Sequence, residues 1–330
     1  GIYIGASNNS SYCFADDSNP SVFCPERFVS AGGGVRLESR AAELPDVTYS
    51  TPVHLSRFLL AGGWVPVELI SVQAKATELE VRYQFNGTVF TARGADLSWL
   101  RFEFPAPDGQ PYGYEWVIDE VPVAPIGGAD PPRWLKRYES SYRLVFEGPY
   151  ATEWRRHCVT SDIPRQASFL GGTKVDGLYA DVASDKFVTT VSCETGAIDT
   201  CLTWGYTPWG LPNPGENIEE SRELYGACLQ AKRAAYFAGP EGGAYRLTSF
   251  TVPHTPIVVR DTFGVMGNNL EVEHVEAVWG PEGARCLNPT NARVPKFRSL
   301  LHAAPSLPPC DSDWRKYGRL VTGRPTPPPP

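Results

Sequence analysis

Four acidic residues in the last third of the chain are candidates for acid–base or metal chemistry. Asp261 is followed by Glu271, Glu273 and Glu276. Two convergent carboxylates can hydrolyse a glycosidic bond, and a cluster of carboxylate oxygens can hold calcium. Glu271 and Glu273 share a face if their segment is a strand, because side chains alternate along a strand. Since the sequence offers them no partner, we favour a solvated surface over a hydrolytic or calcium site, and we expect no metal.

Three aromatic residues form a second candidate site. Trp204, Tyr206 and Trp209 follow one another within six positions. Flat aromatic rings bind the C–H faces of sugars while polar neighbours select hydroxyl groups, which would make this segment a carbohydrate platform. The alternative, which we favour, is that the rings lie in the core and cover a neighbouring disulfide.

The remaining motifs give no catalytic constellation. His157 and Cys158 are adjacent, and neighbouring residues on a strand point to opposite faces, so they cannot easily share a proton. The sequence has no HExxH zinc motif, GxSxG elbow, phosphate-binding loop or dinucleotide fingerprint. We therefore expect no catalytic residue and no cofactor.

The composition is that of a globular, acidic protein. Of 330 residues, 42% are hydrophobic and 20% are charged, which is enough to build cores. The net charge of −7 argues against nucleic acid, because phosphate binding needs a concentrated basic face. No apolar run reaches the length of about 18 residues that crosses a bilayer, so we expect no membrane span.

The cysteines predict a disulfide framework. Their number, eight, is even, and such pairing belongs in an oxidising compartment. The chain begins at Gly1 rather than methionine, which is typical of a mature protein that has lost a signal peptide. We therefore expect a secreted protein of the extracellular surface, with the periplasm as the alternative.

Spacing predicts two local disulfides, Cys13 with Cys24 and Cys193 with Cys201. The other four cysteines allow three pairings, and the residues alone do not choose among them. These four are Cys158, Cys228, Cys286 and Cys310.

The elements that must position these residues are mostly strands. Runs of alternating apolar and polar residues predict strands, mainly antiparallel, up to about residue 200. Asn86-Gly87 predicts a two-residue hairpin turn, because both residues tolerate positive φ. We expect a mainly β (α+β) fold of antiparallel, sandwich-like sheets, stabilised by disulfides. The clearest strand runs are 64–70, 78–85, 99–104 and 114–119.

One helix is predicted near 216–237. Acidic residues follow the turn at 213–215, and Lys232 and Arg233 lie at the other end, so the charges complement the helix dipole. An apolar stripe predicts that one helix face packs on a sheet. The stripe consists of Leu224, Cys228, Ala231 and Ala235.

The chain closes with a proline-rich segment. Such a run forms an extended polyproline helix without internal hydrogen bonds, and ordering it costs about 1–2 kcal/mol per residue. We expect it to pack along its own chain or along a neighbouring copy in an assembly. Its prolines are Pro325, Pro327, Pro328, Pro329 and Pro330.

Several segments together resemble the ADYC domain, a family of secreted or lipid-anchored proteins found mainly in myxobacteria. Cys193 and Cys201 flank a seven-residue segment, 204–209 reads Trp-Gly-Tyr-Thr-Pro-Trp, and Cys228 precedes the end of the predicted helix. Turn 86–88 and segment 276–287 fit the family's opening and closing parts, so the resemblance covers about residues 86–290. The family has no established activity, and the resemblance implies fold and compartment rather than function.

One departure from the family concerns its signature, Ala-Asp-Tyr-Cys, which reads Ala-Ala-Tyr-Phe at 234–237. If the family's aspartate were catalytic or metal-binding, this chain would lack that function; if the segment only closes a helix, little changes, and we favour this second interpretation. The missing thiol should leave another cysteine without its partner. Cys310 lies outside the family-like region, and we infer that it fastens the C-terminal extension to the core.

The resemblance also suggests domain limits. We expect an N-terminal extension or small β domain at 1–80, an ADYC-like domain at 81–295 and a C-terminal extension with the proline-rich tail at 296–330.

The expected function is that of a secreted structural or adhesive surface protein, a subunit of an extracellular filament or other assembly. Its partners would be copies of itself, another surface protein or a glycan. The alternatives are an extracellular hydrolase acting on glycan or peptide and a carbohydrate-binding module.

Overall fold

The computed structural model consists of two compact units. The described residues of unit 1 lie within 10–175 and 183–195, and those of unit 2 lie within 176–182 and 196–330. Each unit is described by itself. The structure describes residues 35–38, 54–104, 112–126, 130–146, 148–156, 158–160, 163–176, 180–194, 197–237, 257–293 and 307–325.

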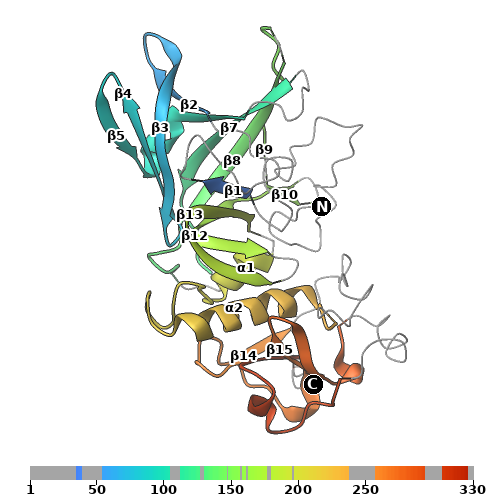
Figure 1. Ribbon diagram of the computed structural model, residues 1–330. Coiled ribbons are helices and arrows are strands. Elements are labelled where there is room, and N and C mark those ends of the chain that lie inside the picture. The colour runs from blue at the N-terminus through green and yellow to red at the C-terminus, as the bar shows by residue number, and fades with distance from the viewer. Residues whose placement is uncertain are drawn as a thin grey trace. The chain divides into compact units, whose positions relative to one another are not determined.

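Unit 1 is built on an eleven-stranded sheet whose path runs β1-β13-β12-β8-β7-β6-β2-β3-β4-β5, with β9 paired to β8 (Figure 1). A separate two-stranded ribbon joins β10 and β11. The elements are β1 (Val35–Glu38), β2 (His54–Leu59), β3 (Gly63–Lys75), β4 (Glu78–Phe85), β5 (Thr88–Ala92), the 3-10 helix η3 (Gly94–Trp99), β6 (Leu100–Phe104), β7 (Tyr112–Val121), β8 (Arg137–Phe146), β9 (Arg155–Arg156), β10 (Val159–Thr160), β11 (Ile163–Pro164), β12 (Ala167–Asp176) and β13 (Asp181–Cys193).

The predicted hairpin turn is confirmed. Asn86 has φ 49° and Gly87 has φ 77°, both in the left-handed region that a two-residue turn between β4 and β5 requires. Phe85 and Thr88 face each other on either side of the turn. The pairing of β4 with β5 is antiparallel, as the sequence predicted.

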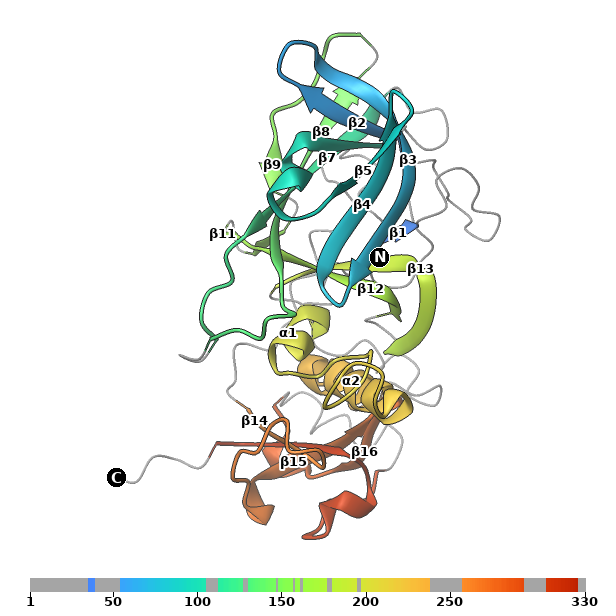
Figure 2. The ribbon, with the colours of Figure 1, turned by 90° about the vertical axis from the view of Figure 1, so that its left-hand side faces the viewer.

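The long hairpin of β3 and β4, a curved ribbon in Figure 2, meets β12 at its turn. The amide of Gly171 donates to the carbonyl of Ala76 at 3.0 Å. A Cβ atom on Gly171 would lie 1.8 Å from the carbonyl oxygen of Ala74. Glycine at position 171 therefore permits a close backbone approach that brings distant parts of the sheet path together.

The core of unit 1 is aromatic. Trp116 lies with its ring centroid 5.6 Å from that of Phe102, and Tyr138 meets Phe169 edge to face at 4.9 Å. All four side chains are fully buried. The Tyr138 hydroxyl accepts a hydrogen bond from the amide of Leu79 at 2.8 Å, so the polar tip of this buried ring is satisfied.

Unit 2 combines two helices with a four-stranded antiparallel sheet of order β14-β17-β15-β16. Figures 1 and 2 both show α2 lying alongside this sheet. The elements are α1 (Ala197–Thr203), α2 (Ile218–Arg233), β14 (Val258–Asp261), the 3-10 helix η6 (Val272–His274), β15 (Val275–Gly280), β16 (Gly283–Leu287), η7 (Pro289–Asn291), η8 (Trp314–Lys316) and β17 (Leu320–Gly323).

Helix α2 confirms the predicted helix. It begins after Asn217, carries acidic residues in its first turn, and ends at Ala234, which adopts the left-handed conformation with φ 51°. The side chains of Leu224, Cys228 and Ala231 are buried, and the helix packs on β15 and β16. Ala235 is buried as well, but it lies beyond the helix end.

The predicted fold class, mainly β with one packed helix and disulfides, is confirmed. The domain limits placed at residues 80 and 295 stay predictions. Cys13 and Cys24 lie outside the described residues, as does the proline-rich segment beyond Pro325. Within the described part of the chain, no helix is both long and apolar enough to cross a membrane.

Candidate functional site

Glu276, one of the four candidate acids, lies in a buried ion pair. Its residue is 1% exposed on β15, and the Arg293 side chain that faces it is 5% exposed. Arg293 Nε lies 2.8 Å from Glu276 Oε1 and 3.0 Å from Oε2. Burial disfavours the charged guanidinium, but the Glu276 carboxylate more than offsets this, so the pKa of Arg293 is raised.

Three further donors saturate the Glu276 carboxylate. The Tyr236 hydroxyl and the Arg293 amide donate to Oε1, and the Thr322 hydroxyl donates to Oε2 at 2.8 Å. Trp279 Nε1 in turn donates to Thr322 Oγ1 at 2.8 Å. Burial, followed by the Glu276 charge, raises the pKa of Tyr236, so this phenol stays protonated. The carboxylate therefore joins β15 to β17 and to the segment that follows helix α2.

Asp261, the second buried acid, organises the turn that follows β14. Its Oδ1 accepts the amides of Phe263 at 2.7 Å and Val265 at 3.2 Å, and its Oδ2 accepts the amide of Met266 at 2.6 Å. The Tyr206 hydroxyl donates to Oδ2 at 3.0 Å. Burial and then the Asp261 charge raise the pKa of Tyr206.

The expectation of a solvated surface for the four acids is wrong for two of them. Asp261 and Glu276 are buried because each accepts hydrogen bonds from its own unit, whereas Glu271 and Glu273 are exposed. Glu273 lies in η6 rather than in a strand. Among the described residues, no group of three or more His, Cys, Asp or Glu side chains has the arrangement of a metal site.

The aromatic platform fails at its central ring. Tyr206 is 0% exposed, with its hydroxyl on Asp261, so it cannot stack on a sugar. Trp204 and Trp209 are partly buried. The core interpretation therefore holds for Tyr206, for a reason that the sequence did not show, since its buried hydroxyl needs the acceptor that Asp261 supplies 55 residues later.

The predicted Cys193–Cys201 disulfide is wrong, because Cys201 pairs with Cys228 at an S–S distance of 2.02 Å. The segment before Cys201 is the start of helix α1 rather than a closed loop. Cys201 lies on the buried part of α1, which packs against α2, where Cys228 is also buried. Cys158, one of the four cysteines left open, is also in a disulfide.

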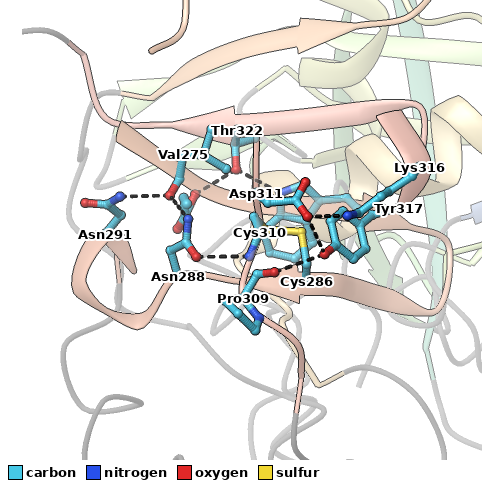
Figure 3. Close-up of a disulfide and its surroundings, with 12 residues drawn as sticks. Val275, Cys286, Asn288, Asn291, Pro309, Cys310, Asp311, Lys316, Tyr317 and Thr322 are labelled. Atoms are coloured by element: carbon cyan, nitrogen blue, oxygen red, sulfur yellow. Dashed lines mark hydrogen bonds and ion pairs between the residues drawn. A yellow bond between two sulfur atoms is a disulfide. The ribbon is translucent and has the colours of Figure 1, made fainter. Parts of the chain in front are cut away.

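The inferred role of Cys310 is confirmed. It pairs with Cys286 on β16, 24 residues earlier in the chain. Figure 3 shows this bond beside Asn288, whose Oδ1 accepts the Cys310 amide at 3.0 Å and whose Nδ2 donates to the Val275 carbonyl at 3.0 Å. Asn291 Nδ2 reaches the same carbonyl at 2.8 Å.

The fastened segment then enters the sheet. β17 pairs antiparallel with both β14 and β15, and the Arg324 amide donates to the His274 carbonyl at 2.9 Å. In Figure 3, Tyr317 points its hydroxyl toward Asp311 and the Pro309 carbonyl, at 3.3 and 3.2 Å. The chain is therefore held by disulfide, sheet and side chains up to Arg324.

The family model of the ADYC domain matches residues 82–293. The chain belongs to the ADYC domain family. No curated protein and no solved structure matches the chain. The ADYC domain match spans residues of both units and stops before Cys310 and β17.

Residues 234–237, which differ from the signature of the ADYC domain, close helix α2. Ala234 is the helix cap, and the amides of Ala234 and Ala235 donate to the carbonyls of Ala231 and Gln230. Tyr236, which keeps the tyrosine of the signature, stacks on Trp279 at 5.3 Å and donates to Glu276. Phe237 is buried where the signature has cysteine. The interpretation that this segment closes a helix accounts for its geometry.

Sequence reasoning missed the partners of the two buried acids. Arg293 and Thr322 lie 17 and 46 residues from Glu276. The only sequence signal was the isolated acid within an apolar strand run, since a carboxylate is buried only when it is paired.

Proposed function

We propose that this protein is a secreted structural or adhesive surface component that associates through the proline-rich segment following β17. The observation that carries the proposal is the firm anchoring of the chain immediately before that segment. β17 is hydrogen-bonded on both sides, and all four of its residues are buried. The segment therefore starts from a fixed point on unit 2.

Two contacts fix this starting point further. The Arg324 amide donates to the His274 carbonyl at 2.9 Å, and Arg324 Nη2 donates to the Thr290 carbonyl at 2.7 Å. The Cys286–Cys310 disulfide holds the preceding stretch to β16. A segment that is attached to a rigid point loses less conformational entropy when it binds a partner. Polyproline sequences in general are also extended before they bind. The partner is a second copy of the chain or another surface protein.

Secretion is supported by the cysteine chemistry. Cys201–Cys228 and Cys286–Cys310 are disulfides of sequence separation 27 and 24. Cytosolic thiol buffers would keep such cysteines reduced, whereas extracellular compartments maintain the bonds. Membership of the ADYC domain family implies no activity, so the proposal depends on these structural features.

Deleting residues 325–330 tests the proposal. Arg324 is kept, so that its contacts with His274 and Thr290 remain. We expect the particle mass measured by light scattering to fall to that of the monomer, with unchanged thermal stability. In a second variant, serine replaces the five prolines at 325 and 327–330; its length is conserved, and it should lose association as well. Full association by both variants would refute the tail as the contact.

A further inference from the structure

Unit 1 carries an exposed aromatic patch that the sequence analysis did not single out. Phe58 on β2 is the direct cross-strand partner of Trp64 on β3, and their rings meet edge to face at 5.3 Å. Trp99, the last residue of η3, lies nearly parallel to Phe58, with ring centroids 6.0 Å apart. Trp99 is 44% exposed, so much of its indole faces water.

Polar groups lie at the border of these rings. Ser56 and Phe58 share a face of β2, and Ser56 is the cross-strand partner of Arg101 on β6. The Arg101 guanidinium lies 4.6 Å from the Trp64 ring centroid, which is within the range of a cation–π contact. We call these residues, with Glu103, the Trp99 patch.

The Arg101 guanidinium is held in place by two carboxylates. Arg101 Nη2 lies 2.7 Å from Glu103 Oε1, and Nη1 lies 3.1 Å from Glu115 Oε1. Ser56 Oγ also donates to Glu103 Oε1, at 2.9 Å. The hydrogen bonds that the Glu103 carboxylate accepts from described residues all end on Oε1, and this side chain is 34% exposed. Oε2 is therefore positioned to accept from a ligand.

We propose that the Trp99 patch binds a neutral glycan. The C–H face of a pyranose would stack on the exposed indole of Trp99, and a ring hydroxyl would donate to Glu103 Oε2. This inference rests on the adhesive part of the proposed function and names its ligand class. A flat aromatic surface beside fixed hydrogen-bonding groups is the combination that sugar rings require.

The charges of the patch favour a neutral glycan over an acidic one. Arg101 is already paired with Glu103 and Glu115, and Glu115 is also paired with Arg143, so the patch offers no unpaired cation to an anionic ligand. A lipid surface would instead require a continuous apolar face with a basic rim. The chain as a whole carries a net charge of −7, which also disfavours an acidic ligand.

Isothermal titration of the full chain with neutral hexasaccharides tests the proposal. The probes are cellohexaose, chitohexaose, laminarihexaose and maltohexaose. We expect one of them to bind. Trp99→Ala removes the stacked ring and should raise the Kd of that hexasaccharide about tenfold, which corresponds to about 1.4 kcal/mol of binding free energy. Trp99→Phe keeps a ring and should bind within about threefold of the wild type.

Trp154→Ala is the matched control. Trp154 is 40% exposed and also lies against an arginine, with Arg143 Cζ 4.8 Å from its ring centroid, but it is outside the patch. Its replacement should leave the Kd unchanged. Failure of every hexasaccharide to bind, equal binding by Trp99→Ala, or equal losses in Trp99→Ala and Trp154→Ala would overturn the site. Trp99-dependent binding to phosphatidylcholine vesicles without glycan binding would overturn the ligand class.

The particle mass of Trp99→Ala separates this inference from the proposed self-association. Loss of glycan binding with unchanged association supports the Trp99 patch as a site distinct from the tail. Glycan binding by a wild-type chain that remains monomeric supports the patch and contradicts assembly through the tail.

Discussion

Replacing Glu276 by glutamine should destabilise unit 2 strongly. The substitution keeps the size of the side chain but removes the counter-charge of Arg293, whose side chain is 5% exposed. It also turns one acceptor oxygen into a donor, although both oxygens accept hydrogen bonds from Arg293 Nε. Breaking a buried ion pair by removing one partner typically costs about 3–5 kcal/mol. That loss is a large part of the roughly 5–15 kcal/mol by which a protein is stable.

Urea unfolding followed by near-UV circular dichroism measures this loss. Glu282→Gln is the matched control, because Glu282 pairs with Arg285 in the same unit but its side chain is 53% exposed. Exposed pairs contribute about 0–1 kcal/mol, so the control should unfold close to the wild type.

A double variant separates the charge effect from the hydrogen bonds. Adding Arg293→Met to Glu276→Gln removes the orphaned guanidinium and should recover part of the loss, since the penalty comes largely from an unpaired buried charge. If Glu276→Gln unfolds like Glu282→Gln, the ion pair does not stabilise unit 2 and the reasoning is refuted.

Three further perturbations have definite expectations. Gly171→Ala should prevent the approach of β12 to the β3–β4 hairpin, because its Cβ would lie 1.8 Å from a backbone oxygen, and should lower the melting temperature of unit 1; an unchanged melting curve would contradict this. The double variant Cys286→Ser/Cys310→Ser opens a loop of sequence separation 24. Under oxidising conditions, its free energy of unfolding in denaturant should be about 3–4 kcal/mol lower than that of the wild type; equal values would contradict a stabilising disulfide. Burial, then the Arg293 charge, lowers the pKa of Lys232, so its folded-state pKa lies below the unfolded one and the charged form costs stability at neutral pH. Lys232→Met should therefore raise the melting temperature at pH 7, and the gain should shrink as the pH rises through the folded-state pKa; an equal gain at all pH values would argue against a charge effect.

The local elements could be predicted from the sequence because their signals are local. Asn86-Gly87 specified its turn through backbone freedom, and the charges around 216–233 specified helix α2 through its dipole. The role of Cys310 also followed, because the family resemblance left one cysteine to pair outside the domain.

The long-range pairings could not be predicted in the same way. The sequence indicated a short loop between Cys193 and Cys201, but α1 packs Cys201 toward α2, and only tertiary packing determines that Cys228 is its partner. The sequence around Asp261 likewise gives no sign that this acid is buried. Its buried carboxylate accepts a hydrogen bond from Tyr206, which lies 55 residues away. The same limit applies to Trp99, whose ring neighbour Phe58 comes from a different hairpin, where it meets Trp64.

The most direct test of the structural or adhesive role is sedimentation of the intact, oxidised protein over a range of concentrations. The account predicts particles heavier than the monomer, with a mass that rises with concentration because copies associate through the segment anchored by β17. A single monomeric species at every concentration would contradict it.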